Sequence, residues 1–235
     1  FADLRLAVKD AEDFLARYQE VHPDEFTAVH TTLLLNEEAE KPEILAALDD
    51  LAGRADSNDR VVVYFSGHGY AMPRRYGKLR VNTYYYVPHD YRSFERLAET
   101  GLSSRELMDR LSVIAAEQIF LLFDTCQSGG AEESFANDMF GSLRLFGEDT
   151  GMFIMASSAA SESSLELGSL DNGLFTHALL AQINPRELPA RGLTFGEAAA
   201  AVAERMRRIV RRVTMGRLTQ TLVATEGEDA VIAEP

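Results

Sequence analysis

The sequence predicts an α/β fold in which a mainly parallel central sheet carries helices on both faces. Two features indicate this class. Apolar runs of the length of buried strands, such as Val61–Phe65 and Gln118–Phe123, end in short polar loops. Between such runs, apolar residues recur at the spacing of amphipathic helices. Strands that alternate with helices generally run in the same direction, so we expect one mainly parallel sheet.

The first half of the chain begins this alternation. Apolar residues at helical spacing predict helices over Ala7–Arg17 and Pro42–Leu51, and a proline is well suited to the first position of a helix. Segments rich in β-branched and aromatic residues predict strands over Phe26–Leu35, Val61–Phe65 and Thr83–Val87.

The second half continues the pattern. The predicted helices span Ser103–Glu117, Leu174–Ile183 and Phe195–Arg212. The predicted strands span Gln118–Phe123, Met152–Ala156 and Thr219–Ala224. A capping-box pattern opens the first of these helices, because a serine is followed three residues later by a glutamate.

The composition restricts what the molecule binds. A chain of 235 residues suits one domain, which we expect to span 1–235. The formal charge of −14 opposes association with nucleic acid and favours polypeptide segments that carry Lys or Arg. No apolar stretch approaches the roughly 18 residues that cross a bilayer, so no membrane insertion is expected. One cysteine cannot form an intrachain disulfide and no signal peptide opens the chain, so we expect a cytoplasmic protein.

The lone cysteine and one histidine follow two of the predicted strands. Cys126 comes after Gln118–Phe123, and His68 comes after Val61–Phe65. In an open parallel sheet, the carboxyl ends of neighbouring strands border one crevice. A nucleophilic thiol requires a neighbour that accepts its proton, and imidazole does so near neutral pH. The pair therefore predicts a thiol protease dyad, and the alternative is a buried structural Cys126 beside an ordinary loop histidine.

Six motifs along the chain resemble the caspase-like cysteine proteases, particularly their bacterial and metacaspase branches. They are Val8-Lys9-Asp10-Ala11, Ser66-Gly67-His68-Gly69, Tyr86-Val87-Pro88-His89-Asp90, Asp124-Thr125-Cys126-Gln127-Ser128-Gly129, Ala156-Ser157-Ser158-Ala159 and Gly173-Leu174-Phe175-Thr176-His177-Ala178-Leu179. Six motifs in the order of the family are more specific than either catalytic loop alone, and they cover nearly the whole chain. The resemblance implies a caspase-like fold and a cysteine endopeptidase that forms an acyl-enzyme on the thiol.

The resemblance also implies features beyond the dyad. The backbone amides of Gly69 and Cys126 would bind the oxyanion, and the two glycines around His68 are expected to let the backbone turn sharply. The family has a strand before the first helix, which Phe1–Leu6 is too short and too polar to supply. The long segment 129–151 lies where activation cleavage often falls in this family. His89 is a rival base, but it lacks flanking glycines.

A carboxylate near the nucleophile predicts a preference for basic substrates. Asp124 precedes Cys126 by two residues, so on an extended backbone its side chain points into the same crevice. In the metacaspase-like branch the matching residue, with those at the positions of Asp10 and Ser66, lines the pocket for an Arg or Lys at P1, the residue before the cleaved bond. The alternative is that Asp124 accepts hydrogen bonds from backbone amides and that Asp10 only favours its own helix dipole.

Other readings stay open. Arg144 is the one basic residue of 129–151 and is a candidate for self-cleavage, unless the segment packs down and hides the bond. Acidic P1 specificity, with Arg5 as the cation, is a rival, as is a pseudoprotease that serves as an interaction module of a larger signalling protein. The sequence contains no metal or cofactor motif, and a calcium response has no ligand set to support it. The basic cluster Arg205–Arg212 is assigned no function, because such helix faces are usually solvated.

Overall fold

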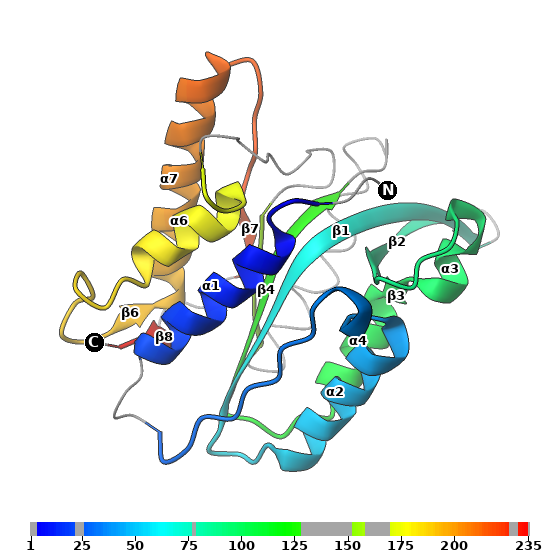
Figure 1. The fold of residues 1–235 in the computed structure, drawn as a ribbon, viewed down its shortest axis with the longest axis horizontal. Helices are drawn as coiled ribbons and strands as arrows, with labels where there is room; N and C mark the ends of the chain where they lie inside the picture. The colour runs from blue at the N-terminus through cyan, green and yellow to red at the C-terminus, as the bar shows by residue number, and fades with distance from the viewer. Residues whose placement is uncertain are drawn as a thin grey trace.

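The computed structural model describes residues 4–21, 26–76, 79–127, 152–157, 170–225 and 230–234, with the backbone alone for 73–76, 79–82 and 126–127. Its centre is a six-stranded sheet in the order β3-β2-β1-β4-β5-β7 (Figure 1). In chain order these strands are β1 (Arg60–Tyr76), β2 (Leu79–Val87), β3 (Leu102–Ser103), β4 (Gln118–Gln127), β5 (Met152–Ala156) and β7 (Val223–Ala224). A separate two-stranded sheet consists of β6 (Leu193–Thr194) and β8 (Val231–Ala233).

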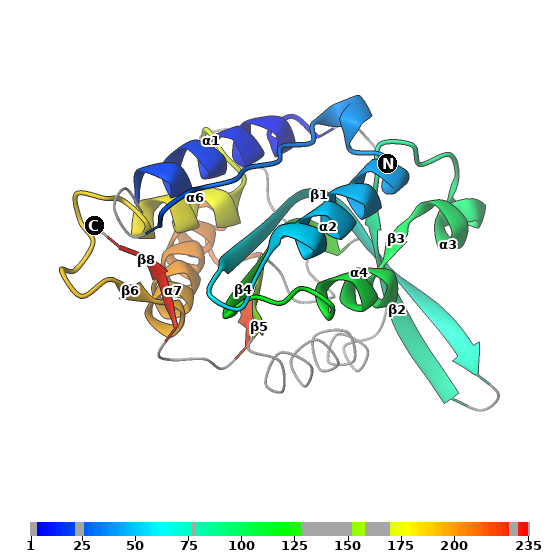
Figure 2. The ribbon, with the colours of Figure 1, turned by 90° about the horizontal axis from the view of Figure 1, so that it is seen from below.

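Helices cover both faces of the central sheet (Figures 1 and 2). One face carries α1 (Ala7–Glu20), α6 (Leu174–Gln182) and α7 (Phe195–Thr214). The other face carries α2 (Lys41–Arg54) and α4 (Ser104–Leu111). The connections include α3 (Leu97–Thr100) and the 3₁₀ turns η1 (Asn36–Glu38) and η2 (Phe94–Arg96). The predicted α/β architecture is confirmed.

Strand β4 divides the core between the two faces. Ile119, Leu121 and Phe123 pack in the cluster that contains α2 and α4. Phe120 and Leu122 pack in the cluster of the opposite face. A strand that is apolar on both faces belongs inside a sheet, and β4 indeed lies between β1 and β5, parallel to both. The edge pairs β1–β2, β2–β3 and β5–β7 are antiparallel.

Strand β1 is longer than the apolar run that predicts it. The backbone stays extended from Arg60 to Tyr76, because residues from His68 onwards pair with β2. The residues expected in a loop, Ser66–Gly69, therefore lie within a strand, and β4 likewise continues through Cys126. Both dyad positions are held by the hydrogen-bonded ladder of a sheet, which positions them more rigidly than loops would.

Three predicted elements need correction. Phe26–Leu35 is extended but belongs to no sheet within the described residues. The helix predicted over Ser103–Glu117 ends at Leu111, after which the chain turns toward β4. The last strand is shorter than Thr219–Ala224, since only its final two residues pair with β5. A pattern of apolar residues indicates burial. A segment becomes a strand only where the edge of another strand lies close enough to pair with it.

A cavity of about 950 Å³ lies beside the segment Phe26–Leu35, which lines one side of it, and β1 lines another. Side chains of α1, such as Phe14, and of α2, such as Leu48, close it from the two faces of the sheet. Along Val61–Gly67, β1 pairs with β4 on one edge, and in the described part of the chain no strand pairs with its other edge. The cavity therefore borders an open edge of the central sheet.

Candidate active site

The parallel register of β1 and β4 brings the predicted site residues together. It pairs His68 with Cys126 and Ser66 with Asp124. Neighbouring strands lie about 5 Å apart, and paired residues share a face of the sheet. Ser66 contacts α1, and Asp124 contacts α6, so this is the face that α1 and α6 cover. Positions 68 and 126, two residues further along each strand, belong to the same face by alternation.

The register also distinguishes His68 from the rival base. His68 is paired directly with Cys126 on the adjacent strand. His89 follows β2, which pairs with β1 on the edge opposite β4. The His89 backbone amide donates to the carbonyl of Ala39, which lies before α2. His68 is therefore the histidine that the fold brings to position 126.

The glycines around His68 serve a different purpose from the one expected. Neither has a positive φ angle, so neither makes a sharp turn. A Cβ atom on Gly67 would lie 2.8 Å from the ring of Tyr86, and one on Gly69 would lie 2.2 Å from the hydroxyl of Tyr84. The glycines therefore leave room for two tyrosines of β2, on the face opposite Ser66.

These two tyrosines form hydrogen bonds to β1 and β4, the two strands that carry the predicted dyad. The hydroxyl of Tyr84 shares a hydrogen bond of 2.6 Å with the hydroxyl of Thr125, the residue before Cys126. The hydroxyl of Tyr86 donates to the carbonyl of Ser66 over 3.2 Å. Tyr84 and Tyr86 thus contact the candidate site, although the sequence pattern assigned them no role there. The signal was present in the run of three tyrosines on β2, but only the register shows what they contact.

A buried pair of carboxylates lies beside the dyad positions. Asp10 of α1 is 3% exposed and Asp124 of β4 is 7% exposed. The Ser66 hydroxyl donates to Asp10 Oδ2 over 3.4 Å, so the three predicted pocket residues meet. Both carboxylates converge on Gly173, where a Cβ atom would lie 2.6 Å from Asp124 Oδ2 and 2.9 Å from Asp10 Oδ2.

The first turn of α6 supplies hydrogen-bond donors to this acid pair. The backbone N–H of Gly173 donates to Asp10 Oδ1 over 2.9 Å. The backbone N–H and the hydroxyl of Thr176 donate to Asp124 Oδ2 over 3.1 and 2.6 Å. Sequence analysis assigned neither residue a role, although a threonine inside so apolar a helix is a usable signal.

Burial and mutual repulsion affect the ionisation of this pair of acids. Burial, together with the neighbouring charge of Asp124, raises the pKa of Asp10 from 3.8 to about 6. Hydrogen bonds from Gly173, Asn172 and Ser66 act in the opposite direction, because they stabilise the charged form. Near neutral pH, above this pKa, the Asp10 carboxylate is negative, and a cation beside the pair would relieve its repulsion with Asp124.

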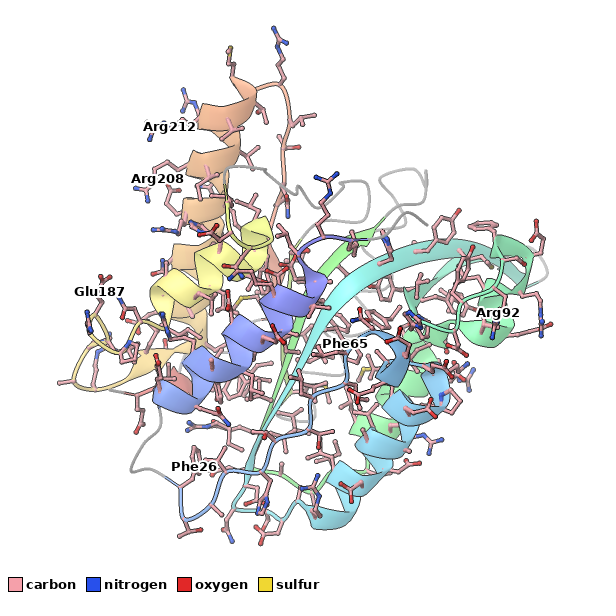
Figure 3. The ribbon with its side chains drawn as sticks, in the orientation of Figure 1. Phe26, Phe65, Arg92, Glu187, Arg208 and Arg212 are labelled. Atoms are coloured by element: carbon pink, nitrogen blue, oxygen red, sulfur yellow. The ribbon has the colours of Figure 1, made fainter. Side chains whose placement is uncertain are left out.

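Other predicted residues do not join this cluster. Arg144 and the segment 129–151 lie outside the described residues. Arg5 is exposed just before α1. Arg208 and Arg212 are exposed and project from α7 away from the sheet (Figure 3), as expected of a solvated helix face.

Two other features are absent from the described ranges. There, no group of three or more His, Cys, Asp or Glu residues is arranged to hold a metal ion. Of the helices described, none is both long and apolar enough to cross a membrane.

Comparison with known proteins agrees with the geometry. A family model described as the caspase domain, Peptidase_C14, matches residues 2–224. Protein GSU0716 from Geobacter sulfurreducens is similar in structure, with a TM-score of 0.67, 18% sequence identity, and coverage of 99% of this chain and 89% of that one. Caspase-1 from Spodoptera frugiperda has a TM-score of 0.61 at 13% identity, covering 99% of this chain and 84% of its own. No curated protein sequence matches.

Proposed function

The chain belongs to the caspase domain family of peptidases, and we propose that it is a cysteine endopeptidase that cuts polypeptides after Arg or Lys. His68 and Cys126 form the dyad of this proposal. The observation that carries the choice of P1 residue is the buried pair of Asp10 and Asp124 beside them. Two carboxylates buried side by side repel each other and are costly to bury, and a cationic ligand would offset that cost.

The spacing within β4 supports this choice. Asp124 precedes Cys126 by two residues, which corresponds to about 6.6 Å along an extended strand. Lys and Arg carry their charge at the end of a stem of three or four methylene groups. A substrate whose P1 carbonyl lies at Cys126 can therefore extend its P1 charge to the acid pair. Ser66, paired with Asp124 and bonded to Asp10, is the third residue of the proposed pocket.

The proposed reaction proceeds through a thioester. His68 accepts the thiol proton of Cys126, and the thiolate attacks the P1 carbonyl carbon. The N–H groups of Gly69 and Cys126 stabilise the resulting oxyanion. The C–N bond then breaks as His68 returns the proton to the departing amine. A water molecule, deprotonated by His68, hydrolyses the thioester and frees the thiol and the P1 carboxylate.

The rival specificity is disfavoured by the same pocket. A P1 aspartate would bring a third negative charge next to Asp10 and Asp124, where repulsion is strong because the site is buried. Arg5, the cation that this rival needs, is exposed.

A matched set of peptides tests the proposal. Peptides that differ only in Arg, citrulline or Asp at P1 compare a cation with its uncharged analogue and with an anion. We expect the Arg peptide to have the highest kcat/KM. Asp124→Asn should lose about 2 to 5 kcal/mol of transition-state binding for the Arg peptide, because the P1 cation loses its partner.

The dyad needs its own controls. Cys126→Ala and His68→Ala should abolish hydrolysis while the circular dichroism spectrum stays that of the wild type. A wild type that cuts the Asp peptide faster than the Arg peptide contradicts the assigned pocket. A wild type that cuts no peptide and is not labelled by an Arg-P1 peptide chloromethyl ketone is a pseudoprotease.

A further inference from the structure

The N-terminus of α6 is built around the acid pair, although it lies about fifty residues beyond Asp124 in the chain. Gly173 is the N-cap residue, and its N–H donates to Asp10, while Thr176 in the first turn donates twice to Asp124. N–H groups at a helix start have no partner within the helix, and the helix dipole there favours negative charge. This helix therefore stabilises the ionised form of both carboxylates.

Gly173 is a glycine for reasons of space, not of backbone conformation. Its φ of −51° and ψ of 150° are accessible to any residue. A Cβ atom there would nevertheless lie within 3 Å of one oxygen of each carboxylate. The absence of a side chain is what lets Asp10 and Asp124 approach the same point from α1 and β4.

Thr176 lies in a hydrogen-bond chain whose direction follows from charge. An ionised carboxylate only accepts hydrogen bonds, so the Thr176 hydroxyl, 2.6 Å from Asp124 Oδ2, donates to it. The Tyr64 hydroxyl, 2.5 Å from the Thr176 oxygen, must then donate to Thr176. Burial and the charges of Asp124 and Asp10 raise the pKa of Tyr64 well above its ordinary value, so its proton remains in place.

We propose that Gly173, Thr176 and Tyr64 are positioning residues for P1 recognition, which hold Asp10 and Asp124 side by side as a charged pair. The effect of these residues on cleavage rests on the proposed function, in which Asp10 and Asp124 bind the P1 cation. The three residues do not touch the substrate and act through the two carboxylates. Losing them should weaken recognition of the P1 charge far more than it weakens the chemical step.

Thr176 offers the sharpest test, because two substitutions separate its hydroxyl from its size. Thr176→Val keeps the shape and the backbone N–H but removes the donor to Asp124, whereas Thr176→Ser keeps the donor. Loss of a hydrogen bond to a charged group should lower kcat/KM for the Arg-P1 peptide roughly 10- to 150-fold. The citrulline-P1 peptide, which lacks the charge, should lose less than about 3-fold on the same scale.

Two further results are expected. Thr176→Ser should recover most of the Arg-P1 rate. In Thr176→Val the acid limb of the Arg-P1 pH profile should move to higher pH, because Asp124 loses a bond that stabilises its charged form. Equal losses on both peptides, or a serine variant as poor as the valine variant, would overturn the inference. If Thr176→Val does not fold, Tyr64→Phe can be compared on the same Arg-P1 and citrulline-P1 peptides. We expect a smaller loss of kcat/KM for the Arg-P1 peptide in that variant.

A readout without turnover separates this inference from the proposed function. In the Cys126→Ala background, the carboxyl groups of Asp10 and Asp124 can be titrated by NMR. Thr176→Val should raise the pH at which the pair titrates, whether or not the wild type cuts Arg peptides. An unchanged titration would contradict the positioning role, and a wild type with no preference for Arg would contradict only the proposed specificity.

Discussion

Asp10 is a residue whose charge costs the folded state free energy. Its carboxyl is 3% exposed, and burial beside Asp124 raises its pKa to about 6, above the value of 3.8 for an exposed aspartate. Between these two pH values the native state binds a proton that the unfolded state has already released. The contribution of Asp10 to stability therefore falls as pH rises from about 4 to about 6 and stays low above it.

We predict that Asp10→Asn stabilises the protein while it impairs cleavage after Arg. Asparagine is neutral and can still accept the hydrogen bond from the Gly173 N–H. Thermal unfolding at pH 8 should show a higher Tm for the variant, by roughly 2–4 °C per kcal/mol of penalty removed. At pH 4 and below the two Tm values should converge. A variant that melts lower than the wild type at pH 8 would show that the charge of Asp10 stabilises the fold.

At the scale of elements, side chains of β2 contact β1 and β4, the two strands that carry the predicted dyad. The β2 residues Tyr84 and Tyr86 reach across β1 at Gly69 and Gly67, and their hydroxyls bond to Thr125 and to the carbonyl of Ser66. Tyr84 is 3% exposed and cannot swing into solvent. These contacts therefore stabilise the pairing of position 68 with position 126, and they lie on the face of the sheet opposite α1 and α6.

We predict that Gly69→Ala is disproportionately damaging. Its Cβ atom would meet the Tyr84 hydroxyl at 2.2 Å, so β2 or β1 must shift. Such overpacking costs about 1–3 kcal/mol, which a thermal melt detects as a lower Tm. Activity should fall further than stability, because the shift displaces Thr125 and His68. The matched control is Gly53→Ala in α2, where a Cβ atom meets no atom within 4 Å and should stabilise the helix by about 0.5–1 kcal/mol. Equal Tm values for the two variants would contradict this packing argument.

At the scale of the whole molecule, β1 has one edge along Val61–Gly67 that pairs with no strand of the described residues. The cavity of about 950 Å³ separates β1 from the extended segment Phe26–Leu35, and apolar residues of α1 and α2 line it. The start of α1 lies beside the middle of β1 (Figure 1), where Ser66 bonds to Asp10, so a strand that ran along Val61–Ser66 into α1 would be parallel to β1. We propose that this space can accept one added strand, which would make Phe26–Leu35 a strand as well.

An extension of the chain tests this arrangement. Seven alternating Val and Thr residues fused before Phe1 should raise Tm by about 5 °C relative to a Gly-Ser extension of equal length. The gain is expected because each buried aliphatic side chain contributes about 1.5–3 kcal/mol, less the cost of ordering the strand. Identical melting of the two fusions would show that the cavity does not accept a strand.

Self-cleavage after Arg144 is a second prediction at this scale. The residue lies in 129–151, outside the described residues, and it matches the P1 preference proposed for the site. Mass spectrometry of purified protein should find a fragment ending at Arg144, and this fragment should be absent from Cys126→Ala and Arg144→Gln. An uncut wild type with full activity would show that the intact chain is the working enzyme.

The sequence by itself determined the fold class and placed the predicted dyad after two of its buried strands. Apolar runs mark the buried strands, and the residues that follow them lie at one edge of a parallel sheet whatever the register. This is why His68, Cys126 and Asp124 could be predicted as site residues without coordinates. Local patterns carry that information, because burial and helical or extended periodicity are properties of neighbouring residues.

The tertiary structure alone decided how these residues meet. Whether position 68 lies beside position 126 depends on the register of β1 and β4, which pairs residues 58 apart in the chain (126 − 68). Whether Asp10 meets Asp124 depends on how α1 packs on the sheet. The hydrogen bonds from Gly173 and Thr176 to this pair depend on how α6 packs there. Phe26–Leu35 has the composition of a strand, but the cavity separates it from the unpaired edge of β1. Such contacts join residues far apart in the chain, so no local pattern specifies them.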